Sequence, residues 1–121
     1  MDIGLRNLDI TLGLSDRALM DFSDVALGRC PLARGAVDHP DVKGLSLLTA
    51  PMSLSPSLTI DKVRAMLDTA RGQYDYILID SPAGLGAGFR LAICGADRAL
   101  VIATNDASSL RDAQRTVCEL E

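Results

Sequence analysis

The sequence has very few of the residues from which most enzyme active sites and metal sites are built. It contains one histidine and three cysteines, and Cys30, Cys94 and Cys118 lie far apart. An odd, sparse set without a Cys-x-x-Cys pair is neither a disulfide framework nor a zinc site. We interpret the cysteines as partly buried thiols in a reducing compartment. His39 stands alone between an aspartate and a proline, so we interpret it as a loop residue.

Long hydrophobic runs and clustered positive charge are also missing. The longest aliphatic run, 99–103, is far shorter than the ~20 residues of a membrane-spanning helix. The sequence has no basic start followed by an apolar stretch, which is the pattern of a secretory signal. With 12 Lys and Arg against 16 Asp and Glu, the net charge is −4, which is not typical of a nucleic-acid-binding surface. We therefore expect a cytoplasmic protein that binds no nucleic acid.

The composition and the hydrophobic spacing of the remaining residues predict a globular α/β chain. Its 121 residues are 48% hydrophobic and 23% charged, which is the composition and size of one domain. Hydrophobic spacing predicts helices at 5–12, 19–26, 31–37, 60–70, 89–94 and 110–120. Caps are expected from Gly28, Gly72, and either Asp106 or Ser108.

Three apolar runs predict strands at 45–48, 76–79 and 99–103, and the continuously apolar run 76–79 should be buried on both faces. Because strands alternate with helices, we predict an α/β fold with a mostly parallel sheet and flanking helices.

An aspartate follows the apolar run 76–79, and ligands of open α/β sheets bind at the carboxyl ends of strands. A carboxylate there can hold Mg²⁺, usually through a water, as a Walker B aspartate does. Alternatively, Asp80 caps the loop that follows. Gly84, Gly86 and Gly88 do not have dinucleotide-binding spacing. They fit either a loop whose N–H groups sense a γ-phosphate or a simple tight turn.

Five motifs in order resemble the MinD/ParA family of deviant Walker A P-loop ATPases. They are Asp2-Ile-Gly-Leu-Arg-Asn-Leu-Asp9, Leu12-Gly-Leu14, Gly28-Arg29-Cys30, Asp80-Ser-Pro-Ala-Gly84 and Ser108-Ser-Leu-Arg-Asp112. The resemblance covers essentially the whole chain and implies one partial P-loop NTPase-like domain over 1–121. Switch I lies at its start, and Walker B and switch II lie at 76–88. The implied activity is ATP hydrolysis in bacterial division-site selection, with ATP and Mg²⁺ as cofactors.

The resemblance also assigns roles to single residues. Asp2 corresponds to the catalytic switch aspartate, which positions the attacking water and lies near Mg²⁺. Asp80 corresponds to the Walker B metal ligand. Ser81, Pro82 and Gly84 begin the second switch, whose backbone responds to the γ-phosphate.

Partner surfaces are implied in the same way. The positions that correspond to the family's surfaces for ATP-dependent homodimerisation and for the activator MinE are Arg6, Asn7, Ser108, Arg111 and Asp112. A MinC-like regulator and peripheral association with the inner membrane are implied for full-length members.

The family's P-loop with its two lysines, its first strands and its carboxyl-terminal membrane helix have no counterpart here. Only Lys43 and Lys62 are lysines, and neither lies in a glycine-rich loop. We therefore expect that the chain alone neither binds nor hydrolyses ATP. The alternative is a non-enzymatic interaction module related to the family. Without the P-loop strand, 76–79 should have an unpaired edge, which predicts dimerisation there, an altered strand order or marginal stability.

Overall fold

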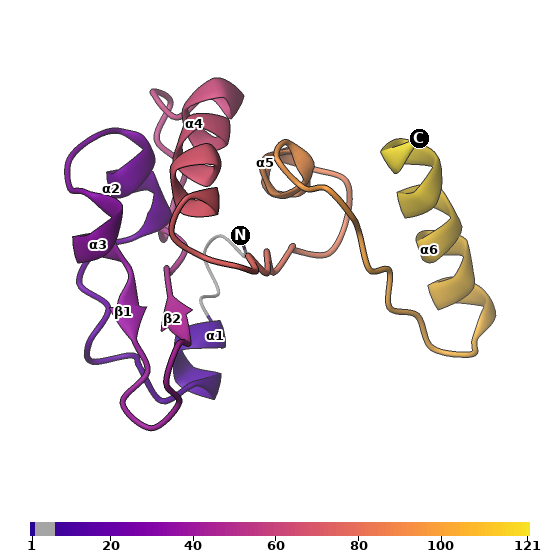
Figure 1. The fold of residues 1–121 in the computed structure, drawn as a ribbon. Helices are drawn as coiled ribbons and strands as arrows, with labels where there is room; N and C mark the ends of the chain where they lie inside the picture. The colour runs from indigo at the N-terminus through magenta and orange to yellow at the C-terminus, as the bar shows by residue number, and fades with distance from the viewer. Residues whose placement is uncertain (2–6) are drawn as a thin grey trace.

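A computed structural model describes residue 1 and residues 7–121 of the chain (Figure 1). Asp2 and Arg6, to which the resemblance assigns roles, therefore lie outside the described residues. Within the described part, the elements in chain order are α1 (Asn7–Thr11), α2 (Phe22–Ala26), α3 (Leu32–Gly35), β1 (Val37–Asp38), β2 (Ser46–Leu47), α4 (Ile60–Arg71), α5 (Ala87–Ile93) and α6 (Ala107–Leu120).

Helix α2 begins later than its hydrophobic spacing predicts, because Asp21 caps it. The Asp21 carboxylate accepts hydrogen bonds from the backbone N–H groups of Ser23 at 2.8 Å and Asp24 at 3.2 Å. The Asp24 carboxylate in turn accepts from the Asp21 N–H at 3.2 Å. This reciprocal capping box fixes the first turn. Leu19, which was predicted to lie in the helix, precedes the cap and is exposed.

Helix α4 carries the centre of the core, as its apolar stripe predicts. Val63, Met66 and Leu67 share one buried face, on which Phe22 of α2 and Leu91 of α5 pack. Burial of several large side chains on one helix contributes on the order of 2 kcal/mol for each. The helix is capped at Gly72, as expected from the sequence. Helix α4 thus holds α2 and α5 together.

The sheet differs from the expected one. Strands β1 and β2 form an antiparallel pair, with Val37 opposite Leu47 and Asp38 opposite Ser46. Within the described residues, the one parallel contact outside these strands is an isolated bridge between Asp21 and Thr49. The mostly parallel sheet is therefore not confirmed. The run 31–37 is split, because helix α3 ends at Gly35 and Val37 begins β1.

Two of the three runs predicted as strands, 76–79 and 99–103, are not strands in this structure. They make no backbone hydrogen bond to any described residue. A strand needs a neighbour for its N–H and C=O groups, and the described chain offers none here. Beyond 99–103, helix α6 lies apart from the other elements (Figure 1) and has no buried residue.

Candidate functional site

The predicted metal ligand Asp80 stands at the end of 76–79, in the loop that leads to α5. Its side chain is exposed, and it makes no hydrogen bond or ion pair with the described residues. No backbone N–H of the following loop donates to the carboxylate, so the alternative of a loop cap is not supported. Asp80 is therefore a carboxylate with all of its acceptor capacity open.

The loop after Asp80 contains one side-chain hydrogen bond and one glycine in a left-handed conformation. The Ser81 hydroxyl donates to the Pro82 carbonyl at 3.3 Å. Gly84 has φ of +85°, a left-handed conformation that side chains rarely adopt, so the turn requires glycine there. Gly86 is the N-cap of α5 and has φ of −78°. The tight-turn interpretation is thus supported for Gly84, whereas a γ-phosphate contact stays a prediction.

A magnesium ion needs oxygen ligands, and most of them are waters when the ion also binds phosphates. Within the described residues, no group of three or more His, Cys, Asp or Glu side chains could hold a metal. Asp80 alone fits one water-mediated contact, because its carboxylate is exposed and has no protein partner. The second predicted ligand, Asp2, lies outside the described part. The described residues supply one exposed carboxylate that could contact a metal ion, and not a complete site.

The predicted partner surface is divided between two distant elements. Asn7 is exposed on α1, whereas Ser108, Arg111 and Asp112 are exposed on α6. The last three line a shallow hollow on α6 together with Arg115. Because α1 and α6 lie at opposite sides of the molecule (Figure 1), the structure does not bring Asn7 to the other three. Arg6 lies outside the described residues.

The start of α6 is set by Asp106, one of its two predicted caps. Its carboxylate accepts from the Ser109 N–H at 2.9 Å and from the Thr104 hydroxyl. These bonds lower the pKa of Asp106 below the usual aspartate range, and the bond from Thr104 has the largest effect. The Thr104 N–H also donates to the Ser109 hydroxyl at 2.9 Å. The predicted partner residues Ser108, Arg111 and Asp112 are thereby held on a well-capped helix.

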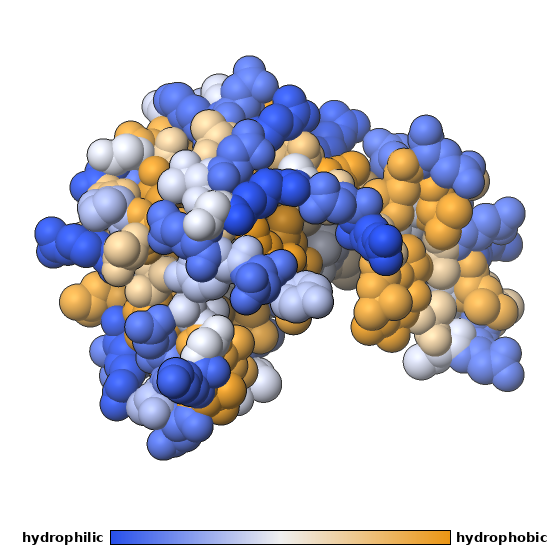
Figure 2. Space-filling view, in the orientation of Figure 1, coloured by the Kyte–Doolittle hydropathy of each residue, from blue (hydrophilic) through white to orange (hydrophobic). Residues whose placement is uncertain are grey.

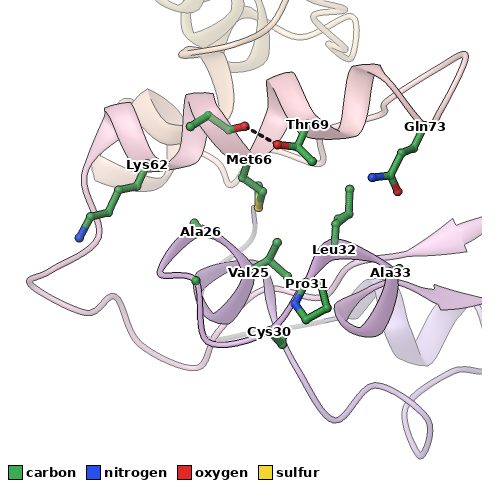
Figure 3. A pocket seen from close by; sticks show the side chains of 12 residues that line it. Val25, Ala26, Cys30, Pro31, Leu32, Ala33, Lys62, Met66, Thr69 and Gln73 are labelled. Atoms are coloured by element: carbon green, nitrogen blue, oxygen red, sulfur yellow. Dashed lines mark hydrogen bonds between the residues drawn. The ribbon is translucent and has the colours of Figure 1, made fainter.

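Sequence analysis did not predict a pocket of about 430 Å³ between α4 and the α2–α3 pair (Figure 3). Its lining is mainly apolar and includes Val25, Leu32 and Met66. Lys62 lies at its rim and donates from Nζ to the Ser57 carbonyl at 3.0 Å. The ammonium group of Lys62 therefore already has a hydrogen-bond acceptor in the loop before α4. The apolar stripe of α4 was the available signal, but it predicts only a buried face.

A second unpredicted feature joins α4 to the segment before 99–103. The Arg71 guanidinium donates to both carboxylate oxygens of Asp97, at 3.1 and 2.9 Å, and to the Gly95 carbonyl. Both bonds to Asp97 come from Nη1, whereas Nη2 donates to the Gly95 carbonyl, so the guanidinium contacts this segment at two points. These contacts hold residues 95–97 against α4, directly before the extended segment 99–103. No sequence pattern pairs residues that lie this far apart.

The three cysteines and the histidine form no common site. Cys30 is buried, Cys94 is half-buried and Cys118 is exposed, and all three are free thiols. Burial raises the pKa of the Cys94 thiol, which disfavours the reactive thiolate. His39 is a loop residue, as predicted: its Nδ1 accepts from the backbone N–H groups of Asp41 at 3.1 Å and Val42 at 3.2 Å.

No helix in the described part is both long and apolar enough to cross a bilayer.

Comparison with known proteins finds similarity to MinD along nearly the whole chain. The sequence is 46% identical over 117 residues to the septum site-determining protein MinD of Helicobacter pylori, covering 96% of this chain and 44% of that protein. It is 36% identical to MinD of Bacillus subtilis, covering 99% of this chain and 46% of that protein. No protein-family profile matches the sequence.

Solved structures show the same likeness. The MinC:MinD cell division protein complex of Aquifex aeolicus contains a chain with a TM-score of 0.86 and 40% identity. The match covers 98% of this chain and 48% of that one. MinD of the same organism gives a TM-score of 0.81 at 39% identity, covering 95% and 47% of the two chains. The chain thus spans about half the length of the relatives it matches.

Proposed function

Because the chain is homologous to the septum site-determining protein MinD, we propose that it is the middle part of a MinD-like ATPase that selects the bacterial division site. The observation that carries this proposal is the 46% identity over 96% of the chain. The fold supports it, since the backbone matches MinD with a TM-score of 0.86 over 98% of the chain. The P-loop NTPase-like architecture follows from these neighbours.

In this proposal, Asp80 is the Walker B ligand of Mg²⁺, which would supply neutralisation of phosphate charge when bound. Support comes from its exposed, unpartnered carboxylate at the end of an apolar segment. The backbone of Ser81, Pro82 and Gly84 would respond to the γ-phosphate in this proposal. Gly84 has a left-handed conformation, which glycine adopts readily. Asp2 would orient the attacking water.

The partners are proposed by the same reasoning. A MinC-like partner is supported by the neighbour that is a MinC:MinD complex. A MinE-like activator and an ATP-dependent homodimer would use Arg6 and Asn7 together with the exposed α6 residues Ser108, Arg111 and Asp112. Peripheral membrane association belongs to the full-length protein in this proposal.

A second candidate is a non-enzymatic interaction module related to MinD. The observation that favours it concerns the lysines, since phosphate binding in P-loop proteins depends on one. Lys62 donates to the Ser57 carbonyl, and Lys43 is exposed in the β1–β2 connection. Neither lysine is close to Asp80 in the sequence, and neither lies in a glycine-rich loop.

A chimera separates the two candidates. In MinD of Helicobacter pylori, the matching 117 residues are replaced by this chain, and the chimera is expressed in cells that lack MinD. We expect restored septum placement and measurable ATP hydrolysis by the purified chimera. The Asp80→Ala chimera should lose at least about tenfold in hydrolysis, because the metal contact is removed. The Asp75→Ala chimera is the matched control, with an exposed aspartate before the same apolar segment.

A folded chimera that binds a MinC-like partner without hydrolysing ATP supports the interaction module. Equal hydrolysis by the Asp80→Ala and Asp75→Ala chimeras contradicts the proposed role of Asp80. Circular dichroism and size-exclusion chromatography establish that each chimera is folded before its activity is interpreted.

A further inference from the structure

Two arginines of α4 hold the turn that follows α5. Arg64 donates from Nε to the Cys94 carbonyl at 3.1 Å, and Arg71 donates from Nη2 to the Gly95 carbonyl. The two arginines are seven residues apart, which is close to two helical turns, so they lie on the same side of α4. Two successive carbonyl groups at the end of α5 are thereby bonded to α4.

Every nitrogen of the Arg71 guanidinium has a partner. Its Nε lies 3.7 Å from a carboxylate oxygen of Asp68, Nη1 donates to both carboxylate oxygens of Asp97, and Nη2 donates to the Gly95 carbonyl. A planar guanidinium offers donors in several fixed directions, whereas a lysine ammonium is a single point charge. Lysine at this position could therefore keep the ion pair with Asp97 but not all three contacts.

The backbone of this turn also packs closely on α4. A Cβ added at Gly95 would lie 2.6 Å from Leu67 Cδ1, which is closer than real Cβ atoms approach other atoms. Leu67 is buried in the same core cluster as Leu91 of α5. Glycine at position 95 therefore lets the chain come near enough to α4 for Arg71 to reach its carbonyl.

These contacts close the stretch of chain that contains Asp80. Residues 72–94 leave the end of α4, pass through Asp80 and return along α5 to Arg71 (Figure 1). Directly before Asp80, Ile79 packs against the core. Joining the two ends of a loop removes conformations from the residues between them. The Arg71 contacts therefore limit the positions that Asp80 and the loop after it can occupy.

The two ends of α5 are held differently. Its first turn has no side-chain cap, because the N-cap residue is Gly86. Gly84, two residues earlier, has a φ of +85°. Backbone that contains glycines changes conformation more readily than backbone whose side chains are packed. The loop after Asp80 can therefore move while the far end of α5 stays on α4.

We propose that Arg71 is a positioning residue for the proposed ATP hydrolysis, because it holds the end of α5 on α4 while the loop after Asp80 responds to phosphate. This inference rests on the proposed function, and Arg71 itself contacts neither nucleotide nor metal in it. Figure 2 shows hydrophilic side chains on the surface over α4 and α5. The side chains of Arg71 and Asp97 are 40% and 77% exposed, and exposed ion pairs contribute little to folding stability. Arg71 should therefore affect metal-dependent hydrolysis and not unfolding.

The Mg²⁺ dependence of ATP hydrolysis by the MinD chimera tests this role. In the Arg71→Met chimera, the Mg²⁺ concentration for half-maximal hydrolysis should rise at least about threefold, because Asp80 is held less precisely. Arg71→Lys should lie between Arg71→Met and the unsubstituted chimera, since the ammonium keeps the pair with Asp97. The matched control is Arg34→Met, which removes an exposed arginine from the last turn of α3 and should change nothing. Urea unfolding should have the same midpoint in all four proteins.

Hydrogen exchange of the 121-residue chain tests the contact itself, without nucleotide. The Ala96 N–H donates to the Ile93 carbonyl at 3.2 Å, next to the residues that Arg71 contacts. Arg71→Met should increase exchange of this amide at least about threefold and leave the amides of α2 unchanged. Unchanged exchange at Ala96 overturns the proposal, and so does a Mg²⁺ dependence equal to that of Arg34→Met. A lower unfolding midpoint in Arg71→Met also overturns it, because Arg71 would then be structural only.

Failure of the proposed function gives a different result. If the unsubstituted chimera does not hydrolyse ATP, or if Asp80→Ala and Asp75→Ala hydrolyse it equally fast, the proposed function is wrong and the positioning role falls with it. If Asp80→Ala is inactive and Arg71→Met behaves like Arg34→Met, the proposed function stands and the positioning role alone is wrong.

Discussion

At the scale of single residues, two aspartates that each follow an apolar run have opposite environments. Asp106, which follows 99–103, accepts from the Ser109 N–H and the Thr104 hydroxyl. Asp80, which follows 76–79, accepts from no group in the described chain. Asp106 is therefore a structural cap, whereas Asp80 is available to a ligand or partner. From the sequence, Asp106 was one of two candidate caps, whereas for Asp80 a metal ligand and a loop cap were both open.

Replacing Asp106 tests the capping role. Asp106→Ala should increase amide exchange at Ser109 severalfold, because the cap bond is lost, whereas Asp106→Asn retains an acceptor and most of the protection. The pKa of Asp106 is lowered in the folded chain, so its contribution is full above the ordinary aspartate pKa. It is lost as pH falls through the lowered value. Nuclear magnetic resonance of the Ser109 amide measures both effects, and protection that is the same in all three proteins contradicts them.

At the scale of elements, α3 packs closely against α2 and the segment around Leu48. A Cβ added at Gly35 would lie 2.5 Å from Val25 Cγ2 and 3.3 Å from Leu48 Cδ1. Real Cβ atoms do not approach other atoms to 2.5 Å, so the α2–α3 contact depends on glycine at this position. The glycine lets α3 end against the core before β1 begins.

Gly35→Ala should destabilise the chain by about 1–3 kcal/mol, because the methyl group overpacks this contact. The matched control is Gly72→Ala at the end of α4, where the nearest atom to an added Cβ is the Thr69 carbonyl oxygen at 3.5 Å. That variant should be neutral or slightly stabilising, since its φ of −77° suits alanine. Urea unfolding followed by circular dichroism compares them, and equal midpoints would contradict the packing argument.

At the scale of the whole molecule, a packed unit around α4 continues into a much more open part. The core residues Phe22, Val63 and Leu91 come from α2, α4 and α5. Beyond α5 the chain is extended and ends in α6, which has no buried residue. The residues proposed to act on ATP are distributed across this molecule, with Asp80 in the open part.

We predict that the isolated chain does not bind ATP measurably. Positioned backbone N–H groups and a lysine provide most of the affinity of P-loop proteins for phosphates, and neither Lys43 nor Lys62 is so placed. Isothermal titration with ATP and Mg²⁺ should show no heat of binding at millimolar ATP. The MinD chimera described above is the positive control. Magnesium-dependent binding by the isolated chain would show that another cradle exists.

Much of the secondary structure could be predicted from local sequence. The α4 stripe, its end at Gly72 and the Asp106 cap all depend on residues within one or two helical turns. The start of α2 was missed because the capping box of Asp21 and Asp24 outweighs the hydrophobic spacing of Leu19. The position of Asp80 at the end of an apolar run was likewise evident from the sequence, whereas its lack of any partner was not.

The sequence by itself determined the helices, the composition of a globular chain and the order of the motifs, because each depends on neighbouring residues. Only the tertiary structure decided that 76–79 and 99–103 are unpaired and that α6 is unburied. The physical reason is that a helix satisfies its own backbone, whereas a strand needs hydrogen bonds from a segment elsewhere. An apolar run can therefore indicate a strand without showing whether its neighbour is present.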